Sequence, residues 1–236
     1  MNIIDIVIIL LIIMSGIIGM KRGFFKEIVM TAGWLLVFII AWYLKNPLAD
    51  FLSLNLPFFN FWGDFKGVTA INIFLYQLIA FIIVYTILMI IFRVVVSITG
   101  LFEKFLDATI ILGIPSKILG FILGLLEGYV LTFIIIFVIA QPIFNFDIVN
   151  ESSFKTAILD HTPVLSNTVK GANNTIKDII ELKEEFSSNS KKEDFNRECI
   201  RVMLKHKFVS AKYVQKLVDA KKIKISGVET IIHQYR

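Results

Sequence analysis

The sequence has few of the residues on which disulfide-rich, metal-binding and nucleic-acid-binding proteins depend. Its one cysteine, Cys199, excludes an intramolecular disulfide framework and any metal site built from several cysteines. Its net charge is only +5 over 236 residues, and no clustered basic face is apparent, so nucleic acid is not an expected partner.

Charge is scarcest in the first part of the chain. Residues 1–141 hold 8 Lys or Arg and 7 Asp or Glu, whereas residues 142–236 hold 16 and 12. The whole chain is 56% hydrophobic with 22 Phe, and soluble domains lie nearer about 45–50%. The sequence therefore predicts a membrane domain over residues 1–141, followed by an aqueous tail.

The membrane domain is expected to be all-α, because a helix of about 20 apolar residues crosses a bilayer. The expected helices cover residues 3–20, 28–44, 70–92 and 118–140. A secretory signal peptide is the alternative for the first of them, but its positive charges, Lys21 and Arg22, follow the apolar run instead of preceding it. A retained helix is therefore predicted.

Helix ends are predicted from charge and proline. Lys45-Asn46-Pro47 is expected to end the second helix, and Arg93 the third. Pro142 should stop the fourth helix, since proline cannot continue the hydrogen-bond ladder. Ser116 is its expected N-cap.

Two connections resemble membrane-surface segments more than ordinary loops. The connections are numbered in chain order, so the second connection joins the second and third helices. It is rich in aromatic residues, which suit the headgroup boundary; they are Phe51, Phe58, Phe59, Phe61, Trp62 and Phe65. A re-entrant segment is the alternative there. Residues 94–107 are expected to form an amphipathic helix along the interface, with an extension of the third helix as the alternative.

Orientation is predicted from the distribution of basic residues. Six of them lie in the first and third connections: Lys21, Arg22, Lys26, Arg93, Lys104 and Lys117. The second connection has only Lys45 and Lys66. Both termini of this multi-pass protein are therefore predicted outside the cytoplasm. The expected interface anchors are Lys21, Arg22, Lys26, Arg93 and Trp62.

The tail is predicted to be helical in three parts. Residues 142–186 form a polar helical segment, 187–192 a linker, and 193–236 a small helical module. Ser210 is expected to cap one helix of that module, and Ser226 with Glu229 forms a capping-box pattern before another. Cys199 is expected in the core of the module.

A search for catalytic residues finds no motif. His161, His206 and His233 lie far apart, and the sequence contains no HExxH, no paired Cys/His spacing and no phosphate-binding loop. No catalytic residue, metal site or cofactor is predicted, and the histidines are expected at the surface.

Glycine spacing is the most informative feature of the membrane domain. Gly120, Gly124 and Gly128 are four residues apart, which places them on one face of a helix where another helix can approach closely. A second glycine-rich surface lies at the end of the first helix and consists of Gly16, Gly19 and Gly23. Both surfaces are predicted to pack helices, within one chain or between protomers.

Two ionisable residues fall within the apolar segments, where charge is costly. Asp5 lies near a helix end, where lipid headgroups can solvate it. Glu127 lies deeper and is a candidate for transport or proton relay.

Several motifs within residues 1–140 together indicate a family resemblance. The resemblance begins with Asp5, Gly19-Met-Lys-Arg22-Gly23-Phe24 and Glu27 before a helix with Trp34 and Ala41. It continues through Leu112-Gly113 and Lys117-x2-Gly120-x3-Gly124-x2-Glu127-Gly128. Together these motifs resemble the colicin V production protein family. This resemblance implies a multi-pass protein of the bacterial inner (cytoplasmic) membrane with four helices, associated with the production or export of peptide toxins and with envelope maintenance. It does not extend to residues 187–236 and implies no molecular mechanism.

Two functional hypotheses follow. The first is a non-enzymatic scaffold or accessory factor whose partners are the lipid bilayer and a second copy or other membrane proteins. The second is a small transporter or channel subunit that uses Glu127, together with Gln77 and the broken aromatic connection. A cavity in the membrane lined by Glu127 would favour the second hypothesis.

Overall fold

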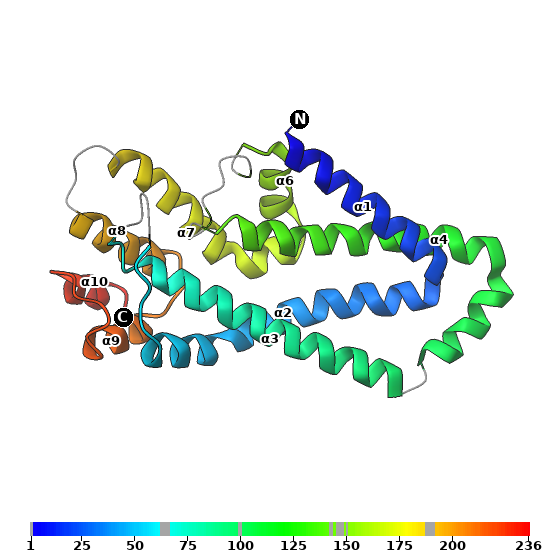
Figure 1. The fold of residues 1–236 in the computed structure, drawn as a ribbon, viewed down its shortest axis with the longest axis horizontal. Coiled ribbons are helices and arrows are strands. Elements are labelled where there is room, and N and C mark those ends of the chain that lie inside the picture. Colours follow the sequence, from blue (N-terminus) through cyan, green and yellow to red (C-terminus); the bar gives the residue numbers. More distant parts are fainter. Residues whose placement is uncertain are drawn as a thin grey trace. The chain divides into compact units, whose positions relative to one another are not determined.

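The computed structural model describes residues 2–61, 67–98, 101–141, 144, 149, 151–186 and 192–236, which form helices and connecting turns with no β-strand among them (Figure 1). The helices are α1 (Ile3–Arg22), α2 (Phe24–Asn55), α3 (Ile71–Ile98), α4 (Leu101–Ile139), α6 (Ser153–His161), α7 (Leu165–Phe186), α8 (Lys192–Lys205), α9 (Ala211–Asp219) and α10 (Val228–Gln234). The all-α fold class predicted from the sequence is confirmed.

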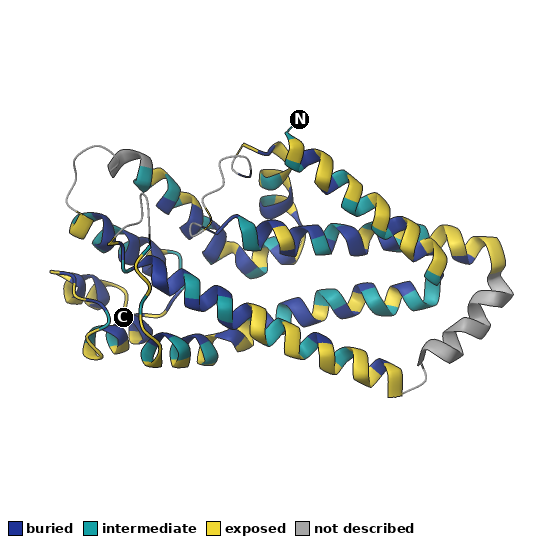
Figure 2. Cartoon of the chain, in the orientation of Figure 1, coloured by how far each residue is buried: buried dark blue, intermediate teal, exposed yellow. Residues whose placement is uncertain are grey.

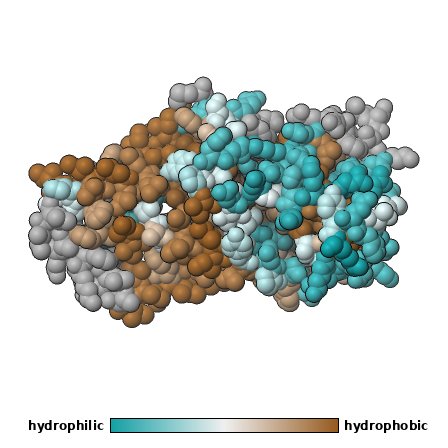
Figure 3. All heavy atoms as spheres, turned by 180° about the vertical axis from the view of Figure 1, so that it is seen from behind, coloured by the Kyte–Doolittle hydropathy of each residue, from teal (hydrophilic) through white to brown (hydrophobic). Residues whose placement is uncertain are grey.

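Four stretches are long and apolar enough to cross a membrane: Ile3–Arg22, Phe24–Asn55, Ile71–Ile98 and Gly113–Ile139. Large apolar side chains are exposed along them (Figure 2), and Ile90 and Ile122 are more than half exposed. Figure 3 shows apolar surface over these helices and hydrophilic surface over the C-terminal helices. Because an extended apolar surface is unfavourable in water, these faces contact lipid.

Helix α2 is longer than predicted at both ends. It begins at Phe24 and continues through Pro47 to Asn55, so the prediction that Lys45-Asn46-Pro47 ends it is wrong. Ala49 and Ser53, just after the proline, are fully buried, and this packing compensates for the lost hydrogen bond. At 1.5 Å per residue the 32 residues span about 48 Å, more than the roughly 30 Å of a bilayer core. One end of α2 therefore projects from the membrane.

Helix α3 does not end at Arg93 but continues to Ile98, because arginine favours helix and the apolar run continues beyond it. Helix α4 already begins at Leu101. The prediction of a single interfacial helix over residues 94–107 is therefore wrong, because these residues are divided between α3 and α4.

Helix α4 contains a sharp break at Gly113, whose φ of 52° and ψ of −122° are not helical. A side chain would disfavour this backbone conformation. The membrane-spanning part begins at this glycine, and Pro115 lies in its first turn. Ser116 is not the cap of this helix as predicted. Its Oγ accepts a hydrogen bond of 3.1 Å from the backbone N–H of Phe24, at the start of α2.

The chain forms two compact units, and α2 and α3 each contribute to both. Unit 1 consists of Met1–Tyr43, Ile82–Ile139 and Phe146–Thr162. Unit 2 consists of Leu44–Phe81, Ala140–Asn145 and Pro163–Arg236.

Unit 1 is built on the pairing of α1 with α4. Helix α2 packs on α4 through aromatic rings, with 5.7 Å between the ring centres of Phe38 and Phe133. It packs on α3 where the ring of Phe92 lies against Gly33, in space that a side chain at Gly33 would need. The hydroxyl groups of Tyr129 in α4 and Thr162, just after α6, form a hydrogen bond of 2.8 Å.

Unit 2 has a core shared between the start of α3 and the tail. Phe74 of α3 stacks on Phe208, with 4.6 Å between ring centres, and fully buried Cys199 of α8 lies in the same core. Helix α7 adds Ile176 and Ile179. The expected module of residues 193–236 is thus one part of a larger core that includes α7 and the start of α3.

Two serines expected to cap tail helices behave differently. Ser210 caps α9 as predicted, because its Oγ accepts a 3.1 Å hydrogen bond from the N–H of Tyr213. The predicted capping box of Ser226 and Glu229 is wrong. The residue before α10 is Gly227, with a φ of 75° that glycine adopts readily, and the N–H of Ser226 donates to Glu193 Oε1 at 2.9 Å.

Candidate functional site

The tight turn between α1 and α2 brings charged residues together. Gly23 is the single residue between the helices and has a φ of 79°. Its N–H donates to the carbonyl of Gly19, and its own carbonyl accepts from the N–H of Glu27. Because glycine tolerates positive φ, the chain reverses here within one residue, and Arg22 and Glu27 meet across the turn.

Arg22, Glu27 and Glu127 form a buried ion cluster in unit 1. Arg22 Nη1 donates to Glu127 Oε2 at 2.9 Å and to Glu27 Oε2 at 3.4 Å. The side chain of Glu27 is fully buried, that of Glu127 is 9% exposed and that of Arg22 is 30% exposed. One guanidinium therefore joins α1, α2 and α4.

This arrangement changes the interpretation of two residues singled out in the sequence. Arg22, an expected interface anchor, is paired with two carboxylates of the same chain. Glu127, the candidate for transport, forms an ion pair with this arginine. A buried charge is costly unless it is paired, so the cluster has a structural role before any other.

All six glycines singled out in the sequence lie at the contact between α1 and α4. A methyl group on Gly124 would lie 2.5 Å from the carbonyl oxygen of Ser15 and 3.0 Å from the Cα atoms of Gly16 and Gly19. Other close approaches join Gly16 to Phe121 and Leu125, Gly120 to Gly19 and Gly23, and Gly128 to Ser15 and Ile12. The two backbones touch at distances that only glycine permits, and both helices belong to one chain.

Asp5 joins the first turn of α1 to the start of α6. It is 2% exposed. Its carboxylate accepts hydrogen bonds from Asn2 N at 2.8 Å, from Ser152 Oγ at 2.5 Å and from Phe154 N at 3.4 Å. The expectation that headgroups solvate this residue is therefore wrong, because the chain itself supplies its partners.

The expected interface anchors differ in exposure. Lys21 and Arg93 are exposed, and Lys26 is half-buried. Trp62 lies outside the described residues, as does Phe65 of the aromatic connection.

In unit 2, buried Asn196 ties the tail to the start of α3. Its amide donates to the carbonyl of Gly67 at 3.0 Å and to that of Lys192 at 3.2 Å, and its Oδ1 accepts from Ala70 N at 3.0 Å. Nothing in the local sequence singles out this residue, because its partners near α3 lie more than a hundred positions away.

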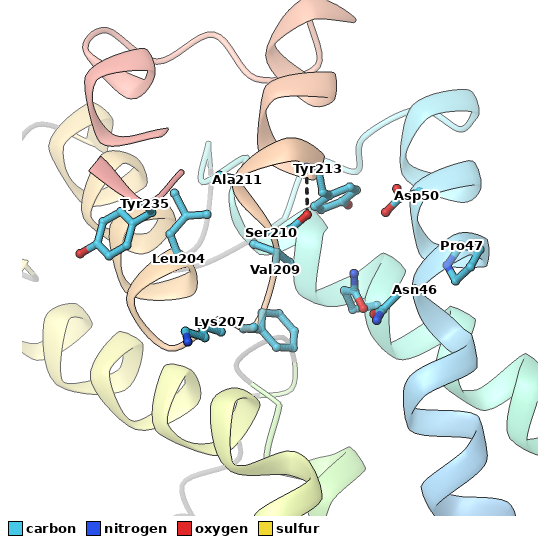
Figure 4. Close-up of a pocket in the computed structure, with 12 residues that line it drawn as sticks. Asn46, Pro47, Asp50, Leu204, Lys207, Val209, Ser210, Ala211, Tyr213 and Tyr235 are labelled. Carbon is cyan, nitrogen blue, oxygen red and sulfur yellow. Dashed lines mark hydrogen bonds between the residues drawn. The ribbon is translucent and has the colours of Figure 1, made fainter. Parts of the chain in front are cut away.

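A pocket of about 630 Å³ lies in unit 2, between the end of α2 and the segment joining α8 to α9 (Figure 4). Its walls include Asn46, Asp50 and Gln77. Lys45, only 2% exposed, donates to Asn46 Oδ1 at 3.2 Å and also to Gln77 Oε1. Lys45 was expected to mark a helix end, and sequence reasoning missed its buried position.

His206, expected at the surface, is mostly buried beside α7. Its Nε2 lies 2.7 Å from Asp178 Oδ2, which also accepts from Lys205 Nζ at 3.1 Å. Burial raises the pKa of Asp178, but the hydrogen bonds and charges of these two partners outweigh burial and hold the pKa below its ordinary value. Among the described residues, no three His, Cys, Asp or Glu side chains gather closely enough to hold a metal ion.

Comparison with known proteins gives two matches. The family model described as Colicin V production protein matches residues 4–163. The uncharacterized transmembrane protein YshB of Bacillus subtilis (strain 168) is 29% identical over 181 residues, which cover 70% of this chain and 94% of YshB. No solved structure matches.

Proposed function

Since this chain belongs to the colicin V production protein family, we propose that this multi-pass membrane protein is a non-enzymatic scaffold or accessory factor in toxin production or export, or in envelope maintenance. It is proposed to lie in the bacterial cytoplasmic membrane and to present unit 2 to other membrane proteins or to a second copy of itself.

The shared core of unit 2 carries this proposal. The tail packs on α3 through the buried side chains of Ile71, Phe74, Cys199 and Met203. Asn196 adds hydrogen bonds between the two segments. A tail with its own weak core would be a mobile appendage, whereas a tail folded onto the end of a membrane helix is a fixed surface on which a partner can assemble.

The contacts within each unit support placing both termini on one side of the membrane. Asp5, at the start of α1, bonds to Ser152, which follows α4. Asn196, in the tail, bonds to Ala70, which precedes α3. These contacts support placing the N-terminus, the second connection and the tail on the same side of the membrane. The basic residues of the first and third connections favour the cytoplasm for the opposite side.

The proposal is tested in intact cells with a membrane-impermeant, thiol-directed photocrosslinker and the full chain carrying Lys224→Cys. Lys224 is an exposed residue of the tail. Native Cys199 will not react, because it is fully buried and burial raises the pKa of its thiol. We expect labelling from outside, followed by the same discrete protein adducts when a second exposed site, Lys212→Cys, is used.

Two control variants make the result interpretable. Lys117→Cys, exposed near the start of the membrane-spanning part of α4, should not be labelled from outside, and the opposite labelling pattern would overturn the orientation. Lipid-facing Ile122→Cys should give no protein adduct with a membrane-permeant version of the reagent. Labelled tail sites without any adduct would contradict the scaffold.

A further inference from the structure

The ion cluster of unit 1 has more negative than positive groups. Glu27 and Glu127 each place one oxygen on the same atom, Arg22 Nη1, at 3.4 and 2.9 Å. Because both oxygens bind the same nitrogen atom, the two carboxyl groups are neighbours. If both were ionised, one cation would balance two anions.

Glu27 is the less satisfied of the two carboxyl groups. It is fully buried, and its Oε1 has no hydrogen-bond donor among the described residues. Its carboxyl carbon lies against the α1–α4 contact, 3.0 Å from where a methyl group on Gly19 would sit. A carboxylate oxygen only accepts hydrogen bonds, but a protonated carboxyl group also donates one.

We propose that Glu27 and Glu127 together form a proton-binding site that holds one proton between them, with Arg22 as the fixed cation. Two adjacent carboxyl groups in a site of low polarity cannot readily carry two negative charges. The bound proton makes the cluster neutral and supplies the donor that the glutamates lack. Arg22, which is 30% exposed, connects the pair to water.

Three lysines lie on the helices around the pair. Lys21 at the end of α1 and Lys117 on α4 are exposed, and Lys26 is half-buried at the start of α2. In the part of α3 that belongs to unit 1, the ionisable residues are Tyr85 and Arg93. Losing the proton would thus leave a negative charge inside the α1–α4 contact, so that protonation stabilises this packing.

The first test is thermal unfolding of the full-length protein at about pH 6 and about pH 9. Carboxyl groups of an unfolded chain are ionised over this range, so a proton held only by the folded protein stabilises it less as pH rises. We expect the midpoint of the native protein to fall by roughly 5 °C more than that of Glu27→Gln. The amide donates a hydrogen bond without a titratable proton, so Glu27→Gln should keep its stability at high pH.

The matched control is Glu229→Gln, an exposed glutamate of α10, which should follow the native pH dependence. If both glutamates are ionised, Glu27→Gln removes an ion pair and lowers the midpoint equally at both pH values, which would overturn the proposal.

Infrared difference spectroscopy of the native protein gives a second, independent test. A protonated carboxyl group has a carbonyl stretch distinct from that of a carboxylate. We expect this band at neutral pH, lost at alkaline pH and absent from Glu127→Gln. Its absence from the native protein at neutral pH would refute the shared proton, whatever the scaffold experiments show.

Discussion

Gly124→Leu is expected to separate α1 from α4 and to cost about 3 kcal/mol of stability. The first atom of the new side chain would meet the backbone at Ser15, Gly16 and Gly19, and a backbone cannot move aside as a flexible side chain can. Lipid offers no hydrophobic force to restore a poorer fit between helices. The measurement is the midpoint of thermal unfolding in detergent, together with the yield of monodisperse protein.

Ile122→Leu is the matched control on the same helix. Ile122 is 55% exposed and faces lipid, so this substitution should change stability by less than about 0.5 kcal/mol. Because the glycines pack within one chain, Gly124→Leu should destabilise the protein without changing its oligomeric state. Equal tolerance at both positions would mean that α1 does not pack on the glycine face.

Arg22→Met is the second substitution with a large expected effect. It removes the cation from two buried carboxyl groups while keeping much of the apolar length of the side chain. Breaking a buried pair on one side leaves an uncompensated charge, and we expect a loss of about 3 kcal/mol, measured by unfolding in detergent. Lys21→Met, at the exposed neighbouring position, should change stability by less than about 0.5 kcal/mol.

A double substitution shows whether the effect of Arg22 runs through Glu127. Adding Glu127→Gln to Arg22→Met removes the anion left without its partner, and part of the lost stability should return. A double variant that loses the sum of both single effects would show that the two residues act independently, against the 2.9 Å contact.

Features that depend on residue type and spacing were predictable. The apolar runs predict the four membrane-spanning helices, and their alternation with short polar segments predicts the all-α fold. The spacing of Gly120, Gly124 and Gly128 predicts a face for close packing, because that face follows from helix geometry alone. Which helix would pack there could not be predicted, since the answer lies in α1, about a hundred residues away.

Features that depend on distant partners were not predictable from local signals. Pro47 favours a helix end locally, yet the buried turn after it keeps α2 helical. Lysine is usually found at the protein surface, but Lys45 is buried inside unit 2. The pairing of Arg22 with Glu127 had one usable signal: ionisable residues are rare within apolar helices, so those of opposite sign should be sought as partners.

The choice between scaffold and transporter depends on what Glu127 does in the membrane. In the structure its carboxylate is paired with Arg22 at the packed junction of three helices. The most direct measurement is ion and proton flux through liposomes containing the purified full-length protein, under an imposed pH gradient and membrane potential. The scaffold account predicts flux no greater than that of protein-free liposomes. A flux above that of protein-free liposomes would contradict the account. If Glu127→Gln abolished this flux, the protein would be a transporter that uses Glu127.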